Sequence, residues 1–138
     1  MTYFVGNALP SLVAAIAYFI LGAIWYMPQV FGKTWMQHTF GTTQMSSEQK
    51  KGMGMAMLGS FIAAAIGACI LRNVLLIMGV DNAMDGARYA LYLSIGFIIV
   101  VMFTDSLYSH KKLSLLAINA GYHTVGYVLM GAILGAWY

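Results

Sequence analysis

Residues 117–123 read AINAGYH and lie inside an otherwise apolar segment that begins at Leu113. Asn119 and His123 are four positions apart, so their side chains share one face of a helix. An amide and an imidazole within an apolar helix need hydrogen-bond partners from neighbouring segments. This face therefore predicts that the other segments pack around the last one.

The composition indicates a chain that lies in lipid. Of its 138 residues, 61% are hydrophobic and 8% are charged, whereas a soluble domain has about 25% charged residues. So few charges cannot cover a surface that faces water, and we expect an integral membrane protein with the lipid bilayer as its surroundings. The net charge of +3 forms no basic stripe, so nucleic acid is not an expected partner.

Hydropathy divides the chain into four apolar segments, each long enough to cross a hydrocarbon core of about 30 Å. We therefore predict an all-α protein whose residues 1–138 form a single bundle of four transmembrane helices. In residues 29–51, aromatic and apolar side chains alternate with polar ones, which predicts a short amphipathic connector in the headgroup region. The expected spans are about 3–26, 52–78, 87–108 and 113–137.

Local signals refine the ends of these helices. Ser46 and Gln49 have the spacing of a capping box that opens the second helix. Aromatic side chains at the ends of membrane helices favour the headgroup region. The expected interfacial anchors are Trp25, Tyr26, Trp35 and Trp137.

Small residues predict close helix contacts. Gly131 and Gly135 form a GxxxG pair, which lets two helix backbones approach closely. This pair suits packing within one chain and a homodimer interface equally well. A second stripe of small residues comprises Ser60, Ala63, Ala64 and Gly67.

The distribution of basic residues predicts the orientation. The second connection is flanked only by Arg72 and Arg88. By the positive-inside rule, the connections richer in lysine are cytoplasmic, so both termini lie outside. The lysines in or beside the first and third connections are Lys33, Lys50, Lys51, Lys111 and Lys112.

His123 is the residue most open to a functional interpretation, because about 15 Å of helical rise places it near the bilayer midplane. Three interpretations remain: a polar clasp that holds helices in register, a small-molecule or proton site, and a metal or haem ligand. The candidate ligand or proton residues are Asn119, Tyr122, His123 and Asp105. The side chains available to bond His123 are Tyr18, Asn7, Ser60, Ser94 and Asn119.

Catalytic and cofactor chemistry is not expected. Asp105 is the only carboxylate within or beside an expected span, so paired-carboxylate catalysis has no second group, and we expect no catalytic residue. A haem would need a second axial histidine at the depth of His123. His38 and His110 lie near polar loops, and two histidines are a weak metal signal, so we expect neither a metal nor a cofactor.

Two longer motifs carry a resemblance to a known family. Residues 22–28, GAIWYMP, precede FGKTW at 31–35, and residues 115–123, LLAINAGYH, precede MGAILGAW at 130–137. In order and spacing these motifs resemble the two signatures of the family catalogued as domain of unknown function 1761. The resemblance implies a bacterial membrane protein of four helices and implies no activity.

These observations lead to two functional hypotheses. The first is a non-enzymatic protein of the bacterial inner (cytoplasmic) membrane, either self-associating or an accessory subunit of a larger complex. The alternative is a small transporter or a protein that binds a lipophilic small molecule with the polar face around His123. Exporters of the small multidrug type carry a carboxylate in their first span, and residues 3–26 carry no charge, which argues against that class.

Overall fold

The computed structural model describes residues 8–44 and 46–137, and within these ranges it is built from helices without a strand. The prediction of an all-α protein is therefore confirmed. The first five residues of the expected first span, and Asn7 as a partner of His123, lie outside the described residues. The helical elements are α1 (Leu9–Trp25), η1 (Pro28–Gly32), α2 (Lys33–Phe40), α3 (Ser47–Ile77), α4 (Ala83–Leu93), η2 (Ser94–Ile99), α5 (Val100–Tyr108) and α6 (Leu113–Ala136).

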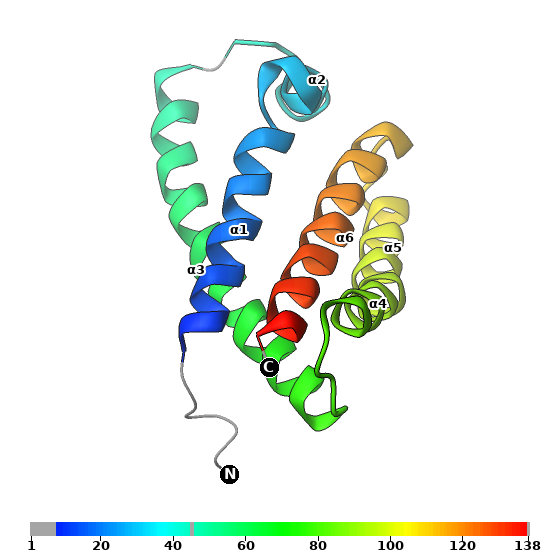
Figure 1. Ribbon diagram of the computed structural model, residues 1–138. Coiled ribbons are helices and arrows are strands. Elements are labelled where there is room, and N and C mark those ends of the chain that lie inside the picture. Colours follow the sequence, from blue (N-terminus) through cyan, green and yellow to red (C-terminus); the bar gives the residue numbers. More distant parts are fainter. Residues whose placement is uncertain (1–7, 45, 138) are drawn as a thin grey trace.

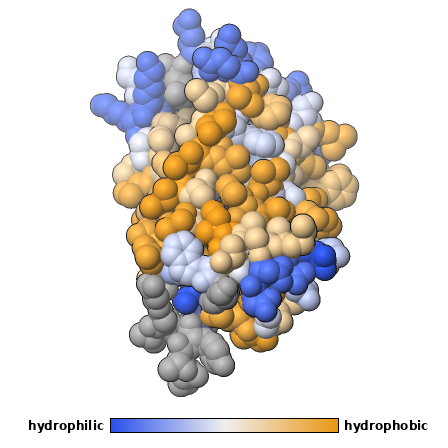
Figure 2. Space-filling view, in the orientation of Figure 1, coloured by the Kyte–Doolittle hydropathy of each residue, from blue (hydrophilic) through white to orange (hydrophobic). Residues whose placement is uncertain are grey.

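Three helical units are long and apolar enough to cross a membrane: α3, the continuous unit Ala83–Tyr108, and α6. A fourth crossing is added if α1 and the segment Pro28–Phe40, which meet at a bend of 49°, are counted as one. The chain thus has three to four helices that could span a membrane. Figure 2 shows the matching surface, in which a hydrophobic band separates hydrophilic ends.

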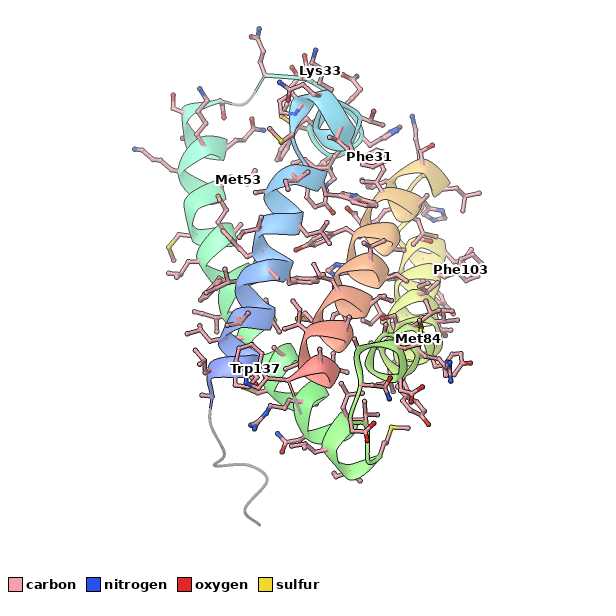
Figure 3. The ribbon with its side chains drawn as sticks, viewed as in Figure 1. Phe31, Lys33, Met53, Met84, Phe103 and Trp137 are labelled. Atoms are coloured by element: carbon pink, nitrogen blue, oxygen red, sulfur yellow. The ribbon has the colours of Figure 1, made fainter. Side chains whose placement is uncertain are left out.

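The helix α6 occupies the centre of the arrangement (Figure 1). Its most extensive contacts are with α4 and then with α1, and α1 also packs against α3. The start of α1 and the end of α6 lie at one end of the molecule, and the α1–α3 and α5–α6 connections lie at the other. Lys33 and Trp137 mark these opposite ends, and Phe103 points away from the other helices (Figure 3).

Local signals lie at both ends of the described first helix. Pro10 lies in the first turn of α1, where a missing N–H is tolerated. After Trp25 the chain turns, and Pro28 opens the π-helical turn η1, whose Gly32 N–H donates to the Met27 carbonyl at 2.9 Å. A side chain on Gly32 would overlap the backbone of Met27. The expected amphipathic connector therefore begins as a tight turn and continues as α2.

Caps fix the starts of two further helices. The capping box is confirmed, because Ser46 Oγ accepts from the Gln49 N–H and Gln49 Oε1 accepts from the Ser46 N–H. Asn82 caps α4, accepting from the Asp85 N–H at 2.8 Å. This cap starts the helix at Ala83, so the expected start at residue 87 was four residues too late.

The GxxxG pair of α6 lies against α4. Gly131 and Gly135 are buried, and a Cβ on Gly131 would overlap the backbone of Gly86. A Cβ on Gly135 would overlap the backbone of Asn82. Because Gly86 and Ala90 are also small, the two helices approach backbone to backbone. In this structure the pair is used within one chain.

Candidate functional site

The polar face of α6 meets α1. The Tyr18 hydroxyl and Nδ1 of His123 share a hydrogen bond of 2.5 Å. Eight residues further along α1, the Tyr26 hydroxyl donates to Oδ1 of Asn119 at 2.7 Å. Asn119 and His123 are half-buried, so these bonds satisfy polar atoms at the contact between two apolar helices.

A third bond joins the same two helices. Nε1 of Trp25 donates to the backbone carbonyl of Ile118 at 3.0 Å. Tyr18, Trp25 and the C-cap residue Tyr26 recur at i, i+7 and i+8, so α1 and its cap present all three hydrogen-bonding side chains on one face. We call this group the α1–α6 clasp, and it comprises Tyr18, Trp25, Tyr26, Ile118, Asn119 and His123.

Aromatic rings fill the space around the clasp. The ring centroid of Tyr18 lies 4.8 Å from that of Tyr122 and 5.8 Å from that of Tyr127, and the Tyr122 centroid lies 5.1 Å from that of His123. Such offset and edge-to-face pairs are favourable beyond the area they bury. The Tyr122 hydroxyl is also near the Tyr18 carbonyl, at 3.4 Å. The imidazole is thus packed among rings from both helices.

Glycines on the facing helices make room for these rings. A Cβ on Gly126 would overlap the Tyr18 ring, and one on Gly22 would lie 2.7 Å from the Tyr122 hydroxyl. A glycine also lies against an aromatic ring at two further positions. The four glycine seats are Gly126 under Tyr18, Gly22 under Tyr122, Gly121 beside Trp25 and Gly67 beside Tyr127.

The turn η1 and the helix α2 cover one end of the clasp. The Phe31 ring lies 5.0 Å from that of Trp25, and the half-buried Trp35 meets Tyr26 edge-to-face at 5.7 Å. Trp25 and Tyr26, which the sequence predicts as interfacial anchors, bond α6. Trp137 is 42% exposed at the opposite end of the molecule.

Asp105 lies outside the clasp. Its carboxylate is exposed on α5 and forms an ion pair of 3.0 Å with Lys111. Asp105, Lys111 and Asn119 line a groove of about 210 Å³ between α5 and α6. Of the four candidate residues, Asn119 therefore belongs to both the clasp and the groove, Tyr122 and His123 belong to the α1 side, and Asp105 belongs to the groove.

The other expected partners of His123 lie elsewhere. Ser60 is exposed on α3, and Ser94 is fully buried in η2 with no hydrogen-bond partner for its hydroxyl among the described residues. Asn119 bonds Tyr26. Tyr18 is thus the partner that the described structure gives to His123, which leaves Nε2 of the imidazole without a hydrogen bond in the described ranges.

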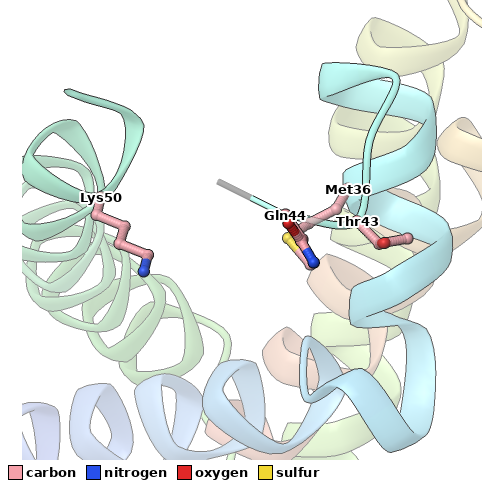
Figure 4. A pocket seen from close by; sticks show the side chains of 4 residues that line it. All are labelled: Met36, Thr43, Gln44 and Lys50. Atoms are coloured by element: carbon pink, nitrogen blue, oxygen red, sulfur yellow. The ribbon is translucent and has the colours of Figure 1, made fainter. Parts of the chain in front are cut away.

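A second cavity lies at the start of α3. Lys50 faces Met36, Thr43 and Gln44 across an open space of about 330 Å³ (Figure 4). None of these four residues belongs to the α1–α6 clasp. Residues 8–44 and 46–137 contain no group of three or more His, Cys, Asp or Glu side chains that could hold a metal ion.

Sequence reasoning identified Asn119 and His123 but missed most of what holds them. Trp25 and Tyr26 were interpreted as interfacial anchors, and Tyr127 and Gly126 were not considered. Gly67 was placed in a stripe of small residues without its partner Tyr127. The available signal was the periodicity of α1, where Tyr18, Gly22, Trp25 and Tyr26 recur at helical spacing and alternate bulky rings with a small residue.

Comparison with known sequences shows that the chain matches a protein family. A sequence model described as "Protein of unknown function (DUF1761)" matches residues 9–135. This range includes both motifs quoted above except the last two residues of the second. No curated protein and no solved structure matches the chain.

Proposed function

The chain belongs to the DUF1761 family, and from that premise we propose that it is a non-enzymatic membrane protein that self-associates. The α1–α6 clasp is the observation that carries the first part of the proposal. Asn119 and His123, the polar residues within α6 that were most open to a chemical role, bond Tyr26 and Tyr18. Their arrangement suits holding two helices in register.

Self-association is supported by an exposed face of α3. Gly52, Ala56, Gly59 and Ala63 follow one another at helical spacing, and all four are exposed. A Cβ added at Gly52 or Gly59 would meet nothing within 4 Å. We call these four residues the α3 small-residue face. Close helix pairs in membranes form where small residues let the backbones approach.

The chain itself provides a precedent for how such a face packs. On α6, the small residues Gly131 and Gly135 lie against Gly86 and Ala90 of α4. The α3 small-residue face has comparable spacing, and the buried residues of α3 lie on a different face of that helix. They are Ala64, Ala68, Leu71 and Leu75. We infer that α3 of a second copy covers the small-residue face.

The distribution of lysines supports the orientation that we propose. We place the protein in the bacterial inner (cytoplasmic) membrane, with the α1–α3 and α5–α6 connections on the cytoplasmic side and both termini outside. The support is the excess of lysine in those two connections. Both connections lie at the same end of the molecule, as this orientation requires (Figure 1).

Native mass spectrometry of protein released from lipid nanodiscs tests the proposal. We expect the wild type to have a mass of at least two times 15.0 kDa, and an integer multiple of it. Ala56→Leu and Ala63→Leu should shift the distribution to monomer, because each adds a bulky side chain to the α3 small-residue face. Ala117→Leu is the matched control, since Ala117 is exposed on α6. A wild-type monomer would overturn self-association, and a different polypeptide in fixed ratio would make the chain an accessory subunit.

A small transporter or lipophilic-ligand binder that uses His123 is the second candidate. The observation that favours it is Nε2 of His123, which has no hydrogen bond in the described ranges and so remains available to a ligand or a proton. Proteoliposome flux assays distinguish the two functions. Transport predicts a pH-dependent flux that is lost in His123→Leu while the oligomer persists, and self-association alone predicts no such flux.

A further inference from the structure

The groove between α5 and α6 has a chemical character that the clasp does not explain. One end holds a carboxylate and an ammonium group, Asp105 and Lys111, in an ion pair of 3.0 Å. The side walls are apolar and include Val101, Leu115 and Leu116. Pockets of this kind bind molecules that combine an apolar body with a few polar groups. We propose that the groove binds phosphatidylethanolamine, through its headgroup and the upper part of an acyl chain.

The charged groups are able to take further partners. A carboxylate accepts several hydrogen bonds and an ammonium donates three, whereas the ion pair uses one atom of each group. The side chains of Lys111 and Asp105 are 50% and 62% exposed. An exposed ion pair contributes little by itself. A zwitterion that places a phosphate on Lys111 and an ammonium on Asp105 extends the pair into an alternating set of four charges.

Asn119 supplies a third polar contact. Its Oδ1 accepts from Tyr26, and its amide nitrogen, which makes no hydrogen bond in the described ranges, belongs to a side chain that lines the groove. The amide nitrogen is a donor, so it suits a phosphate oxygen. The groove thus offers two donors to the phosphate and one acceptor to the amine.

The position of the groove favours a lipid over a soluble zwitterion. Asp105 lies in the last turn of α5, and Leu115 and Leu116 lie in the first turn of α6, so the groove is at the end of a membrane-crossing pair. At this depth a headgroup reaches the charges while an acyl chain runs along the apolar walls. The adjoining face of α5 is exposed at Val101, which is 66% exposed.

The ethanolamine group distinguishes this lipid from its relatives. Its ammonium carries N–H bonds that donate to Asp105, whereas the quaternary ammonium of phosphatidylcholine has no N–H and phosphatidylglycerol has no cation. A charge-assisted hydrogen bond is about twice as strong as a neutral one. The carboxylate of Asp105 therefore selects phosphatidylethanolamine.

Native mass spectrometry from nanodiscs of equal parts phosphatidylethanolamine, phosphatidylcholine and phosphatidylglycerol, with identical acyl chains, tests this selection. We expect retained phosphatidylethanolamine to exceed each of the other lipids by at least about threefold in the wild type. Asp105→Asn should bring phosphatidylethanolamine and phosphatidylcholine to parity. Asp81→Asn is the control, because Asp81 is an exposed aspartate in the α3–α4 loop. A wild type without preference, or a preference that survives Asp105→Asn, would overturn the proposal.

A second measurement uses only the wild-type chain, so it does not depend on the folding of a variant. Phosphatidylethanolamine with a diazirine in its acyl chain should crosslink mainly to residues 101–102 and 115–116. Crosslinks of equal yield along the exposed residues 55–60 of α3 would contradict a defined groove. Millimolar O-phosphoethanolamine should leave the crosslinks unchanged, and full displacement by it would mean that the groove takes a soluble zwitterion. None of these outcomes depends on self-association.

Discussion

Tyr18 and His123 are 105 positions apart in the chain, yet their side chains share a hydrogen bond of 2.5 Å between α1 and α6. Tyr26 and Asn119 repeat the pattern closer to α2. Two hydroxyls at the i and i+8 positions of α1 thus match an amide and an imidazole at i and i+4 of α6, which fixes how the two helices slide and rotate against each other.

The Tyr18–His123 bond should contribute to stability as a pair. In a double-mutant cycle of Tyr18→Phe and His123→Leu, we expect a coupling of about 0.5–2 kcal/mol, the range found for hydrogen bonds between membrane helices. The measurement is the free energy of unfolding in a titration of mixed micelles with sodium dodecyl sulfate.

Tyr108→Phe serves as the control for that cycle, because Tyr108 is 85% exposed and lies outside the clasp. It should leave the free energy of unfolding unchanged. If the two substitutions change the free energy of unfolding additively, the Tyr18–His123 bond contributes no coupling energy, and it does not stabilise the contact between α1 and α6.

A methyl group added at a glycine seat on α6 should displace the ring of α1 that packs on it, and so should disturb the clasp. Gly126→Ala places a Cβ in the Tyr18 ring, so the ring must move and its bond to His123 must lengthen. We expect a loss of about 1–3 kcal/mol in the free energy of unfolding, as for overpacked cores. Gly54→Ala is the matched control, since a Cβ there meets nothing within 4 Å; equal effects of the two changes would argue against the seat.

The contact between α4 and α6 should tolerate substitution even less. In Gly131→Ala the added Cβ meets the Gly86 backbone, which cannot rotate away as a side chain can. We expect the helices to separate, with a loss at least as large as that of Gly126→Ala and with faster proteolysis of the α3–α4 loop. Gly131→Ala protein with wild-type stability and proteolysis would refute the backbone-to-backbone contact.

The orientation can be read from cysteine labelling in intact cells. In a Cys69→Ser background, Asp81→Cys should react with a membrane-impermeant maleimide, and Thr43→Cys should react only after the cells are opened. The two positions are exposed and lie in the α3–α4 and α2–α3 connections. The reverse labelling pattern would mean that the orientation is the opposite of the proposed one, with both termini in the cytoplasm.

Hydropathy and caps predicted most of the fold. The all-α class followed from apolar segments of membrane length, and the start of α3 followed from the spacing of Ser46 and Gln49. The start of α4 was misplaced because the cap at Asn82 was interpreted as part of a loop. The first helix ends at Trp25, within one residue of the expected end, and hydropathy alone does not show the bend of 49° that follows it.

The site was less predictable because it depends on which helices are neighbours. The face of Asn119 and His123 is evident from i and i+4 spacing, but its partners lie 93 and 105 positions away and come from one face of α1. The sequence named Tyr18 among several candidates. Nothing local distinguished it from Ser94, which is buried in η2 without a hydrogen-bond partner in the described ranges.

The central place of α6 also sets the order in which the protein can be made. Since synthesis runs from the N-terminus, Tyr18, Trp25 and Tyr26 are made long before Ile118, Asn119 and His123 exist to bond them. Until α6 is made, the polar groups of Tyr18, Trp25 and Tyr26 lack the α6 partners that they bond in the finished structure. Every nascent chain that stalls before α6 is therefore left with an incomplete clasp.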